Sequence, residues 1–195
     1  MTAIAAVTVD SRQVLKHAYD AARHLPERVL HRRRHLAVLR RLRSAQRPRS
    51  ILVACYGNVC RSPYLQAVLQ RALPDLSVMS AGFRGSDRPV PQASVTLSEK
   101  RGLDLSRFRS RPLTQSLVSN AELVIVMDSD QARLMTSMFR VNPVRIVIAG
   151  DLDPRFDATR GIIDPWNQSD DVFESSFNRL DRCAATLVTA VQHAK

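Results

Sequence analysis

The amino-acid sequence predicts an α/β fold, in which a parallel β-sheet carries helices on both faces, preceded by a basic helical extension. Three observations predict it. Short apolar runs typical of strands alternate with helical segments over residues 51–195, and arginine is concentrated ahead of them in residues 1–50. The run at residues 122–128 is apolar throughout its middle, as in a strand covered on both faces. Strands that alternate with helices generally form a parallel sheet between two helical layers.

The length and composition fit one domain with an extension. A chain of 195 residues, 45% of them hydrophobic, can bury a sizeable core and is too apolar to be disordered throughout. Its three cysteines, Cys55, Cys60 and Cys183, are too few for a disulfide scaffold and suit a reducing cytoplasm. No apolar run approaches the roughly 20 residues of a membrane span. The weakly apolar residues 3–9 lack the basic segment that begins a signal peptide.

The formal charge of +11 belongs mainly to the extension. Residues 1–50 hold twelve Lys and Arg against three acids, whereas residues 51–195 hold seventeen against fifteen. We therefore expect a basic helical extension at residues 1–48 and an α/β domain at residues 49–195. The extension is expected to form helices at residues 11–25 and 27–44, divided by Pro26, with a linker at residues 46–50.

The second helix of the extension is amphipathic and basic. Val29, Leu36, Leu39 and Leu42 recur at spacings of seven, three and three, and arginine fills much of the remainder. Such a helix can contact an acidic partner protein, an anionic membrane surface or a second copy of the chain, and nucleic acid fits it less well. The alternative is that the leucine stripe packs on the rest of the protein and leaves the arginines in solvent.

The elements of the domain follow from its apolar runs and from the signals that start and stop helices. Asp171 and Glu174 are spaced to form a capping box at the start of the last helix. In a parallel sheet the ligand site lies beyond the carboxyl ends of the strands. Strands are expected at residues 51–54, 76–83, 122–128 and 144–149, and helices at residues 61–70, 92–101, 114–119, 130–138 and 171–193.

Residues 51–63, ILVACYGNVCRSP, place a cysteine and an arginine at the two ends of one loop at that edge. The loop begins at Cys55, where the first strand ends, and closes at Arg61, where a helix with Pro63 in its first turn begins. Backbone N–H groups at a helix N-terminus favour an oxyanion such as phosphate, and Arg61 adds a bidentate partner. The same setting favours the thiolate of Cys55, a nucleophile for the bound phosphorus. The simpler alternative makes Cys55 a small buried hydrophobe that ends a strand.

The loop sequence at residues 55–63, Cys-Tyr-Gly-Asn-Val-Cys-Arg-Ser-Pro, resembles the signature of the low-molecular-weight protein tyrosine phosphatases, C-x-G-N-x-C-R-S-P. The resemblance covers about residues 50–195. It implies a flavodoxin-like four-stranded parallel sheet with helices on both faces, and a cysteine-dependent protein tyrosine phosphatase without metal or cofactor. Further motifs stand in the order expected for the family: Ser80-Ala-Gly, Gly102-Leu-Asp-Leu-Ser, Arg109-Ser-Arg-Pro-Leu-Thr, Leu123-Val-Ile-Val-Met-Asp and Asp164-Pro165.

The resemblance also implies the roles of the catalytic residues. Cys55 would be the nucleophile that forms a phosphocysteine, and Arg61 would clamp the phosphate. Asp164, in an Asp-Pro pair followed by an aromatic residue, would be the general acid and later the general base. Asp153, in the other Asp-Pro pair, is the alternative acid, because Asp-Pro is also an ordinary turn dipeptide.

Supporting roles come from the same resemblance. Ser62 would hydrogen-bond the Cys55 thiolate, and Asn58 would hold the loop together with Ser80, although the first also fits a helix cap and the second a turn asparagine. A reversible disulfide would join Cys60 to Cys55. Two aromatic side chains would wall the pocket mouth around a phosphorylated ring, or else pack as surface aromatics. The expected phosphate- and substrate-binding residues are Tyr56, Gly57, Asn58, Val59, Cys60, Ser62 and Trp166.

Three positions depart from the family pattern. Phe108 stands where a histidine usually orders the loop asparagine, so we expect Asn58 to be held in another way. Gln66 replaces a glutamate in the helix after the loop. Trp166 is followed by asparagine instead of a second aromatic residue, which leaves substrate preference open. Val59 argues against phosphoarginine, because relatives directed at that substrate carry threonine at this place.

The sequence thus predicts the hydrolysis of phosphotyrosine in a protein substrate, such as a bacterial tyrosine kinase. We expect the enzyme to be cytoplasmic or held at the membrane periphery. Two alternatives stay open. An arsenate reductase of the same fold needs two further relay cysteines, and Cys183 alone supplies this relay poorly. A phosphate-binding regulatory module would act through its basic N-terminal helices.

Overall fold

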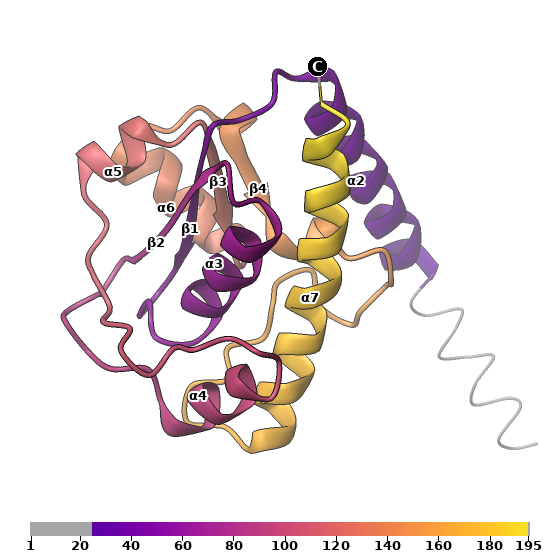
Figure 1. Ribbon diagram of the computed structural model, residues 1–195. Helices are drawn as coiled ribbons and strands as arrows, with labels where there is room; N and C mark the ends of the chain where they lie inside the picture. The colour runs from indigo at the N-terminus through magenta and orange to yellow at the C-terminus, as the bar shows by residue number, and fades with distance from the viewer. Residues whose placement is uncertain (1–24, 195) are drawn as a thin grey trace, which may run out of the picture.

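The structure, a computed structural model, describes residues 25–194 (Figure 1). The helix expected at residues 11–25 lies outside them apart from its last residue. The elements in order are α2 (Leu25–Ser44), β1 (Ser50–Cys55), α3 (Arg61–Ala72), β2 (Ser77–Gly82), α4 (Gln92–Glu99), α5 (Gln115–Asn120), β3 (Leu123–Val126), α6 (Ser129–Phe139), η1 (Pro143–Arg145), β4 (Ile146–Ile148), η2 (Ala149–Leu152) and α7 (Asp170–Gln192).

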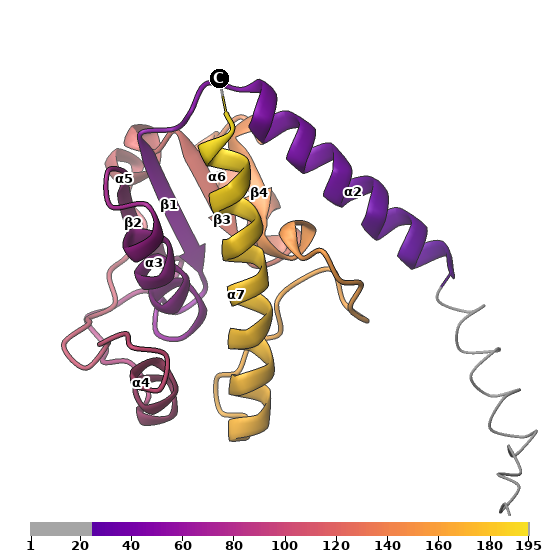
Figure 2. The same ribbon diagram turned by 45° about the vertical axis from the view of Figure 1, so that its right-hand side comes forward.

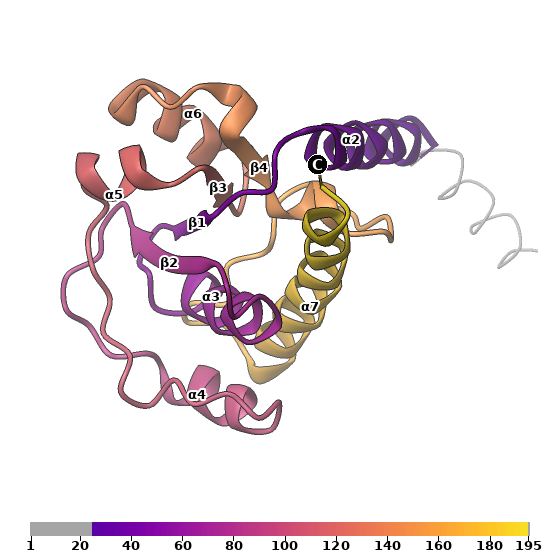
Figure 3. The same ribbon diagram turned by 45° about the horizontal axis from the view of Figure 1, so that its top comes forward.

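The four strands form one parallel sheet in the order β2-β1-β3-β4. Successive side chains of β1 point to opposite faces, as the two-residue period of a strand requires. Ile51 and Val53 join the core beneath α3 and α7, whereas Leu52 and Ala54 pack on the side of α5 and α6. Figure 3 shows these helix pairs on the two faces of the sheet. The predicted α/β fold with a four-stranded parallel sheet is confirmed.

Two local predictions are wrong. The fourth strand begins at Ile146, because Pro143–Arg145 forms a 3-10 turn in which the Asn142 side chain accepts a hydrogen bond from the Val144 N–H. The capping box is not formed: α7 starts at Asp170, so that Asp171 lies inside the first turn. There it can still interact favourably with the helix dipole.

Helix α2 packs on the domain through its second half. Val38 and Leu42 are buried in the main core, and Leu39 packs against it, whereas Val29 and Leu36 are exposed. The predicted leucine stripe is therefore split between core and solvent. Val29 and Leu36 lie on the face of α2 that points away from the domain, and Figure 2 shows that the helix also diverges from α7 toward its Leu25 end. The division into residues 1–48 and 49–195 stays a prediction.

Polar contacts also fasten α2 to the sheet edge. The Arg41 Nη2 donates a hydrogen bond of 2.8 Å to the carbonyl oxygen of Ile146 in the edge strand β4. His35 Nδ1 lies 3.0 Å from the carbonyl oxygen of Asp151. None of the helices within residues 25–194 is long and apolar enough to cross a membrane.

Truncation of Leu42 to alanine tests this packing. We expect Leu42→Ala to lower the free energy of unfolding by about 2–4 kcal/mol, because it leaves a cavity in the core. The control Leu36→Ala, at a side chain that is 46% exposed, should change that free energy by less than about 0.5 kcal/mol. Denaturant titration measures both, and equal effects of the two substitutions would contradict the packing of α2.

Candidate active site

The loop between β1 and α3 lies at the carboxyl end of the sheet (Figure 1). It lines a cavity of about 360 Å³. Strand β1 ends at Cys55, and α3 begins at Arg61, so the loop amides and the helix N-terminus lie at the same place. This geometry favours the binding of an oxyanion. The described residues that line the cavity are Cys55, Tyr56, Gly57, Val59, Cys60, Arg61, Arg84, Arg88, Asp164 and Trp166.

The Cys55 sulfur is held by two hydrogen-bonding groups of the loop. Ser62 Oγ lies 3.0 Å from Cys55 Sγ, and the Asn58 N–H donates to the same sulfur over 3.3 Å. Donors that point at a sulfur stabilise its negative charge, and so does the adjacent N-terminus of α3. The sulfur is therefore fixed at the wall of the cavity, with hydrogen-bonding groups and the helix N-terminus directed at it.

Asn58 fastens the loop to three separate segments. Its Nδ2 donates to Ser62 Oγ and to Ser80 Oγ, each over 2.9 Å, and its Oδ1 accepts from the Arg111 N–H over 3.0 Å. The residue is fully buried and has a φ of 52°, a left-handed conformation that asparagine tolerates better than most residues. The side chain thus compensates for a backbone shape that is costly by itself.

The departures at Phe108 and Gln66 are explained by this network. Phe108 packs against the main core, and the hydrogen-bonding atoms of Asn58 are satisfied without a histidine. Ser80 Oγ donates to Gln66 Oε1 over 2.6 Å, which orients the serine oxygen to accept from Asn58. Gln66 is therefore a supporting residue that the sequence reasoning noted only as a departure.

Two motifs quoted for the family meet at the loop. A Cβ on Gly82 would come within 2.8 Å of the Tyr56 carbonyl oxygen and 2.9 Å of the Asn58 backbone nitrogen. Glycine is therefore needed where the loop passes over the end of β2. Arg111 donates from its Nε to the Ser80 carbonyl oxygen over 2.8 Å. The Ser80–Gly82 motif and the segment around Arg111 thus both pack against the loop between β1 and α3.

Arg61 is directed into the cavity although it is only 3% exposed. Its Nη1 donates to the Ile162 carbonyl oxygen over 3.0 Å, and its Nη2 forms an ion pair with the Asp164 carboxylate. Among the described residues its Nε has no hydrogen-bond partner. The guanidinium therefore has donors that can turn to phosphate oxygens.

Asp164 and the two predicted aromatics surround the mouth. The Asp164 carboxylate accepts from the Trp166 N–H over 3.3 Å, and its side chain is 45% exposed. Tyr56 and Trp166 are both partly exposed. An acid at a solvent-accessible position beside Arg61 can reach both a leaving oxygen and a water molecule.

Arg84 and Arg88 line the same cavity and were not among the predicted site residues. Arg88 Nη2 lies 3.4 Å from the Gly57 carbonyl oxygen, and its guanidinium lies 5.6 Å from the centre of the Trp166 ring. It thus spans from the loop to the aromatic wall. The only signal in the sequence is the cationic charge around a Gly/Pro-bearing segment, and that segment has no fixed spacing from Cys55.

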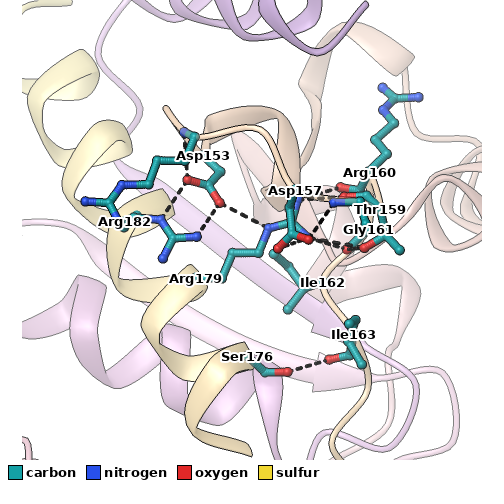
Figure 4. Close-up of polar contacts among 12 residues, drawn as sticks. Asp153, Asp157, Thr159, Arg160, Gly161, Ile162, Ile163, Ser176, Arg179 and Arg182 are labelled. Carbon is teal, nitrogen blue, oxygen red and sulfur yellow. Dashed lines mark hydrogen bonds and ion pairs between the residues drawn. The ribbon is translucent and has the colours of Figure 1, made fainter. Parts of the chain in front are cut away.

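The alternative acid Asp153 lies in a different environment (Figure 4). It is fully buried, and it accepts hydrogen bonds from Arg179 Nε over 3.1 Å and from Arg182 Nη2 over 2.7 Å. Burial favours its neutral form, but the hydrogen bonds from Arg182 and the Arg155 backbone, with both arginine charges, outweigh burial and hold the pKa of Asp153 below its ordinary value. Asp153 does not line the cavity. Its geometry suits a structural ion pair.

Arg179 connects that ion pair to the segment that carries the site. It donates to the Thr159 and Gly161 carbonyl oxygens, each over 2.8 Å. Ser176 Oγ, also on α7, donates to the Ile163 carbonyl oxygen over 3.0 Å. Figure 4 shows these contacts along one stretch of chain. Helix α7 thereby holds the backbone that leads to Asp164.

The other two cysteines are buried free thiols. Burial, together with the nearby Cys55 and Asp164, raises the pKa of Cys60 well above its ordinary value. Burial likewise raises the pKa of Cys183 to about 12. Cys60 lines the cavity, whereas Cys183, on the buried face of α7, lies in the core and does not. The reversible Cys55–Cys60 disulfide stays a prediction.

The family model described as low molecular weight phosphotyrosine protein phosphatase matches residues 50–195. The chain belongs to this family. The phosphatase is 36% identical over 135 residues to a probable low molecular weight protein-tyrosine-phosphatase, EpsP, of Ralstonia nicotianae, covering 69% of this chain and 90% of that one. It is 29% identical over 136 residues to the phosphatase Etp of Escherichia coli K12, covering 69% and 89%.

Solved structures of the family share its fold. The phosphatase superposes on the tyrosine phosphatase AmsI of Erwinia amylovora with a TM-score of 0.68 at 26% identity, covering 73% of this chain and 93% of that one. The tyrosine phosphatase Wzb of Escherichia coli K30, in complex with sulphate, gives 0.66 at 27% identity, covering 73% and 97%. The predictions of the family, of the fold and of an enzyme that hydrolyses phosphotyrosine are confirmed.

The substitution Asp153→Asn tests the role assigned to the Asp153 ion pair. At neutral pH we expect it to lower the free energy of unfolding by about 3 kcal/mol, because it leaves the buried Arg179 with only the partly exposed Asp157 as a counter-charge. Since the folded pKa of Asp153 lies below its ordinary value, the carboxylate stabilises the fold above the unfolded pKa of about 4, and this contribution is lost as the pH falls through the folded pKa.

The difference in the free energy of unfolding between wild type and Asp153→Asn should therefore become smaller below about pH 4. Denaturant titrations across that pH range measure it. Asp157→Asn is the matched control, because that carboxylate is 35% exposed and lies 3.4 Å from Arg179; it should cost less than about 1 kcal/mol. A difference in the free energy of unfolding that stays constant with pH would contradict the role assigned to the Asp153 ion pair.

Proposed function

We propose that phosphotyrosine hydrolysis proceeds through a phosphocysteine on Cys55, with Arg61 as the phosphate clamp and Asp164 as the acid and base. One observation carries the proposal. Cys55, Arg61 and Asp164 line one cavity, and the Arg61 guanidinium links the phosphate site to the Asp164 carboxylate.

In the first step the Cys55 thiolate attacks phosphorus. The S–P bond forms and the ester P–O bond breaks, while protonated Asp164 gives its proton to the phenolic oxygen that leaves. Phosphate oxygens compete with the Asp164 carboxylate for the Arg61 guanidinium. Binding of the dianion would therefore free Asp164 to face the leaving group.

In the second step water attacks the phosphocysteine. Asp164, now a carboxylate, takes a proton from that water, the S–P bond breaks, and inorganic phosphate leaves with the thiolate restored. Ser62, 3.0 Å from the sulfur, would stabilise the departing thiolate. The loop amides and Arg61 would stabilise the equatorial oxygens in both steps.

The substrate we propose is phosphotyrosine in a protein, such as a bacterial tyrosine kinase. Tyr56 and Trp166 at the mouth support a flat phosphorylated ring, and the relatives EpsP and Etp are named protein-tyrosine-phosphatases. An arsenate reductase finds no support, because Cys183 is buried away from the cavity and cannot relay a disulfide from Cys55 without a large rearrangement. A regulatory phosphate-binding module does not account for Asp164, because the binding of phosphate alone needs no general acid.

The extension supplies a second proposal, on location. On a helix wheel the exposed Val29, Arg33, Leu36 and Arg40 share one face of α2, opposite the face that packs on the domain. Apolar side chains interleaved with arginines suit an anionic membrane surface. We propose a cytoplasmic enzyme that this outward face holds at the membrane periphery.

Kinetics of three variants test the catalytic roles. Cys55→Ser should abolish turnover of an aryl phosphate, and Asp164→Ala should lower kcat by about 10²- to 10⁴-fold, the usual contribution of a general acid. The loss in Asp164→Ala should shrink for esters whose leaving group needs no proton. Asp171→Asn, an exposed carboxylate in the first turn of α7, is the control. Turnover retained by Cys55→Ser would rule the proposal out.

Sedimentation with lipid vesicles tests the proposed location. The full chain should sediment with vesicles that contain anionic lipid and remain in the supernatant with neutral ones. The double variant Arg33→Glu/Arg40→Glu should weaken this by about tenfold or more, because each arginine near an anionic surface contributes about 1 kcal/mol. Equal binding of both proteins would argue against a role for this face.

A further inference from the structure

A second cavity, of about 650 Å³, lies between α2 and the edge of the sheet. Helix α2 forms one wall, and α6 with the edge strand β4 forms the other. The family match begins at residue 50, so the α2 wall lies outside it. The cavity is therefore built jointly by the extension and the phosphatase domain. We call it the α2 groove; among the residues that line it are Arg34, Ala37, Val38, Arg41, Arg133 and Arg160.

The floor of the α2 groove is mainly apolar, with contributions from Val38, Ile146 and Ile148. Strand β4 is only three residues long, and its Ile146 carbonyl oxygen already accepts from Arg41. The edge is therefore a poor template for an added strand, which needs a row of free backbone groups. A groove of this kind suits the apolar face of a helix.

The rim of the α2 groove is cationic. Arg34, Arg41, Arg133 and Arg160 line it against one carboxylate, Asp151. Both Asp151 oxygens are engaged by Arg160, at 2.9 and 2.7 Å. Within residues 25–194 Arg41 has no carboxylate within salt-bridge distance, Arg34 reaches Glu27 only at 3.7 Å, and Arg133 is paired with Asp130 in an exposed ion pair. The rim therefore favours a partner that supplies carboxylates.

The α2 groove lies close to the active site along the chain. Arg160 lines the groove and Asp164 lines the catalytic cavity, so their Cα atoms are at most about 14 Å apart. Gly161 and Ile162, between them, are held by Arg179 and Arg61. Residues 160–164 thus join the rim of the groove directly to the catalytic cavity.

We propose that the α2 groove docks an acidic amphipathic helix of the phosphotyrosine protein substrate, an inference that rests on the proposed function. The helix places aliphatic side chains on the floor and carboxylates at the arginine rim. Residues 1–24 of the chain itself complement the groove poorly, because they hold three Lys and Arg against two acids. Docking raises the effective concentration of the phosphotyrosine beside Cys55 without a new contact at the phosphate.

A peptide selection tests the occupant. Random peptides of about 15 residues, long enough for a marginal helix, are selected on the immobilised full chain. Their affinity is then measured by fluorescence anisotropy for wild type, Arg34→Glu/Arg133→Glu and the matched control Arg40→Glu, whose side chain lies on the outward face of α2. We expect the selected peptides to carry acidic residues interleaved with aliphatic ones at helical spacing. Their affinity for the double variant should be about tenfold or more lower than for wild type, and their affinity for Arg40→Glu should be unchanged.

A linked substrate tests whether the docked protein is the substrate. The selected peptide is joined to a phosphotyrosine peptide through a Gly/Ser linker of about 10 residues, which reaches about 17 Å. KM for the linked peptide should fall about tenfold or more below that of the unlinked phosphotyrosine peptide in wild type and in Arg40→Glu, but not in Arg34→Glu/Arg133→Glu. Turnover of an aryl phosphate should be equal in all three proteins.

Each other outcome is decisive. If no peptide is selected that depends on the groove, or if selected peptides lack acidic residues, the acidic helix is refuted. If KM for the linked peptide is no lower than KM for the unlinked phosphotyrosine peptide, substrate docking is refuted. A change of oligomeric state in the double variant would assign the groove to a second copy, against the proposal. Absence of aryl phosphate turnover in wild type would instead refute the proposed function.

Discussion

The hydrogen bonds of the Asn58 side chain are the constraint on which the active site depends. One amide holds α3 through Ser62, the end of β2 through Ser80, and the segment before α5 through the Arg111 N–H. These bonds are buried, where an unpaired partner is costly, so they fix the loop in one shape. That shape in turn directs the Asn58 N–H at the Cys55 sulfur. The proposed nucleophile, the loop amides and the N-terminus of α3 are therefore positioned by a single side chain.

A second constraint comes from α7 and sets the other half of the reaction. Arg179 is buried against Asp153 and uses its remaining donors on the Thr159 and Gly161 carbonyl oxygens. The next residue, Ile162, holds Arg61 by its own carbonyl oxygen. The phosphate clamp and the proposed acid are thus positioned by a salt bridge that lies outside the catalytic cavity. The burial of a charged pair is costly in itself. The Arg179–Asp153 pair fixes the path of the chain between η2 and α7.

Features with a local cause could be predicted from the sequence, whereas those that depend on distant contacts could not. The strand, loop and helix around Cys55 follow from an apolar run, a glycine and a proline at fixed spacing. The replacement of the usual histidine by Phe108 was visible, but its compensation by Gln66 needs the meeting of α3 with β2. Arg84 and Arg88 reach the cavity only because the loop after β2 folds back over it. The leucine stripe of α2 was recognised, yet only the packing on α7 shows that Leu42 is buried and Leu36 is not.

We propose that one thiolate, fixed by the Asn58 network, takes the phosphoryl group. This proposal is tested most directly by rapid quenching of the full chain during turnover of an aryl phosphate whose leaving group needs no proton, in the Asp164→Ala background, where loss of the base slows hydrolysis of the intermediate but not its formation. Mass spectrometry of the denatured protein should find one HPO3 unit per chain, on the peptide that contains Cys55. A phosphoryl group on any other residue, or release of phosphate without a phosphorylated enzyme, would contradict the account.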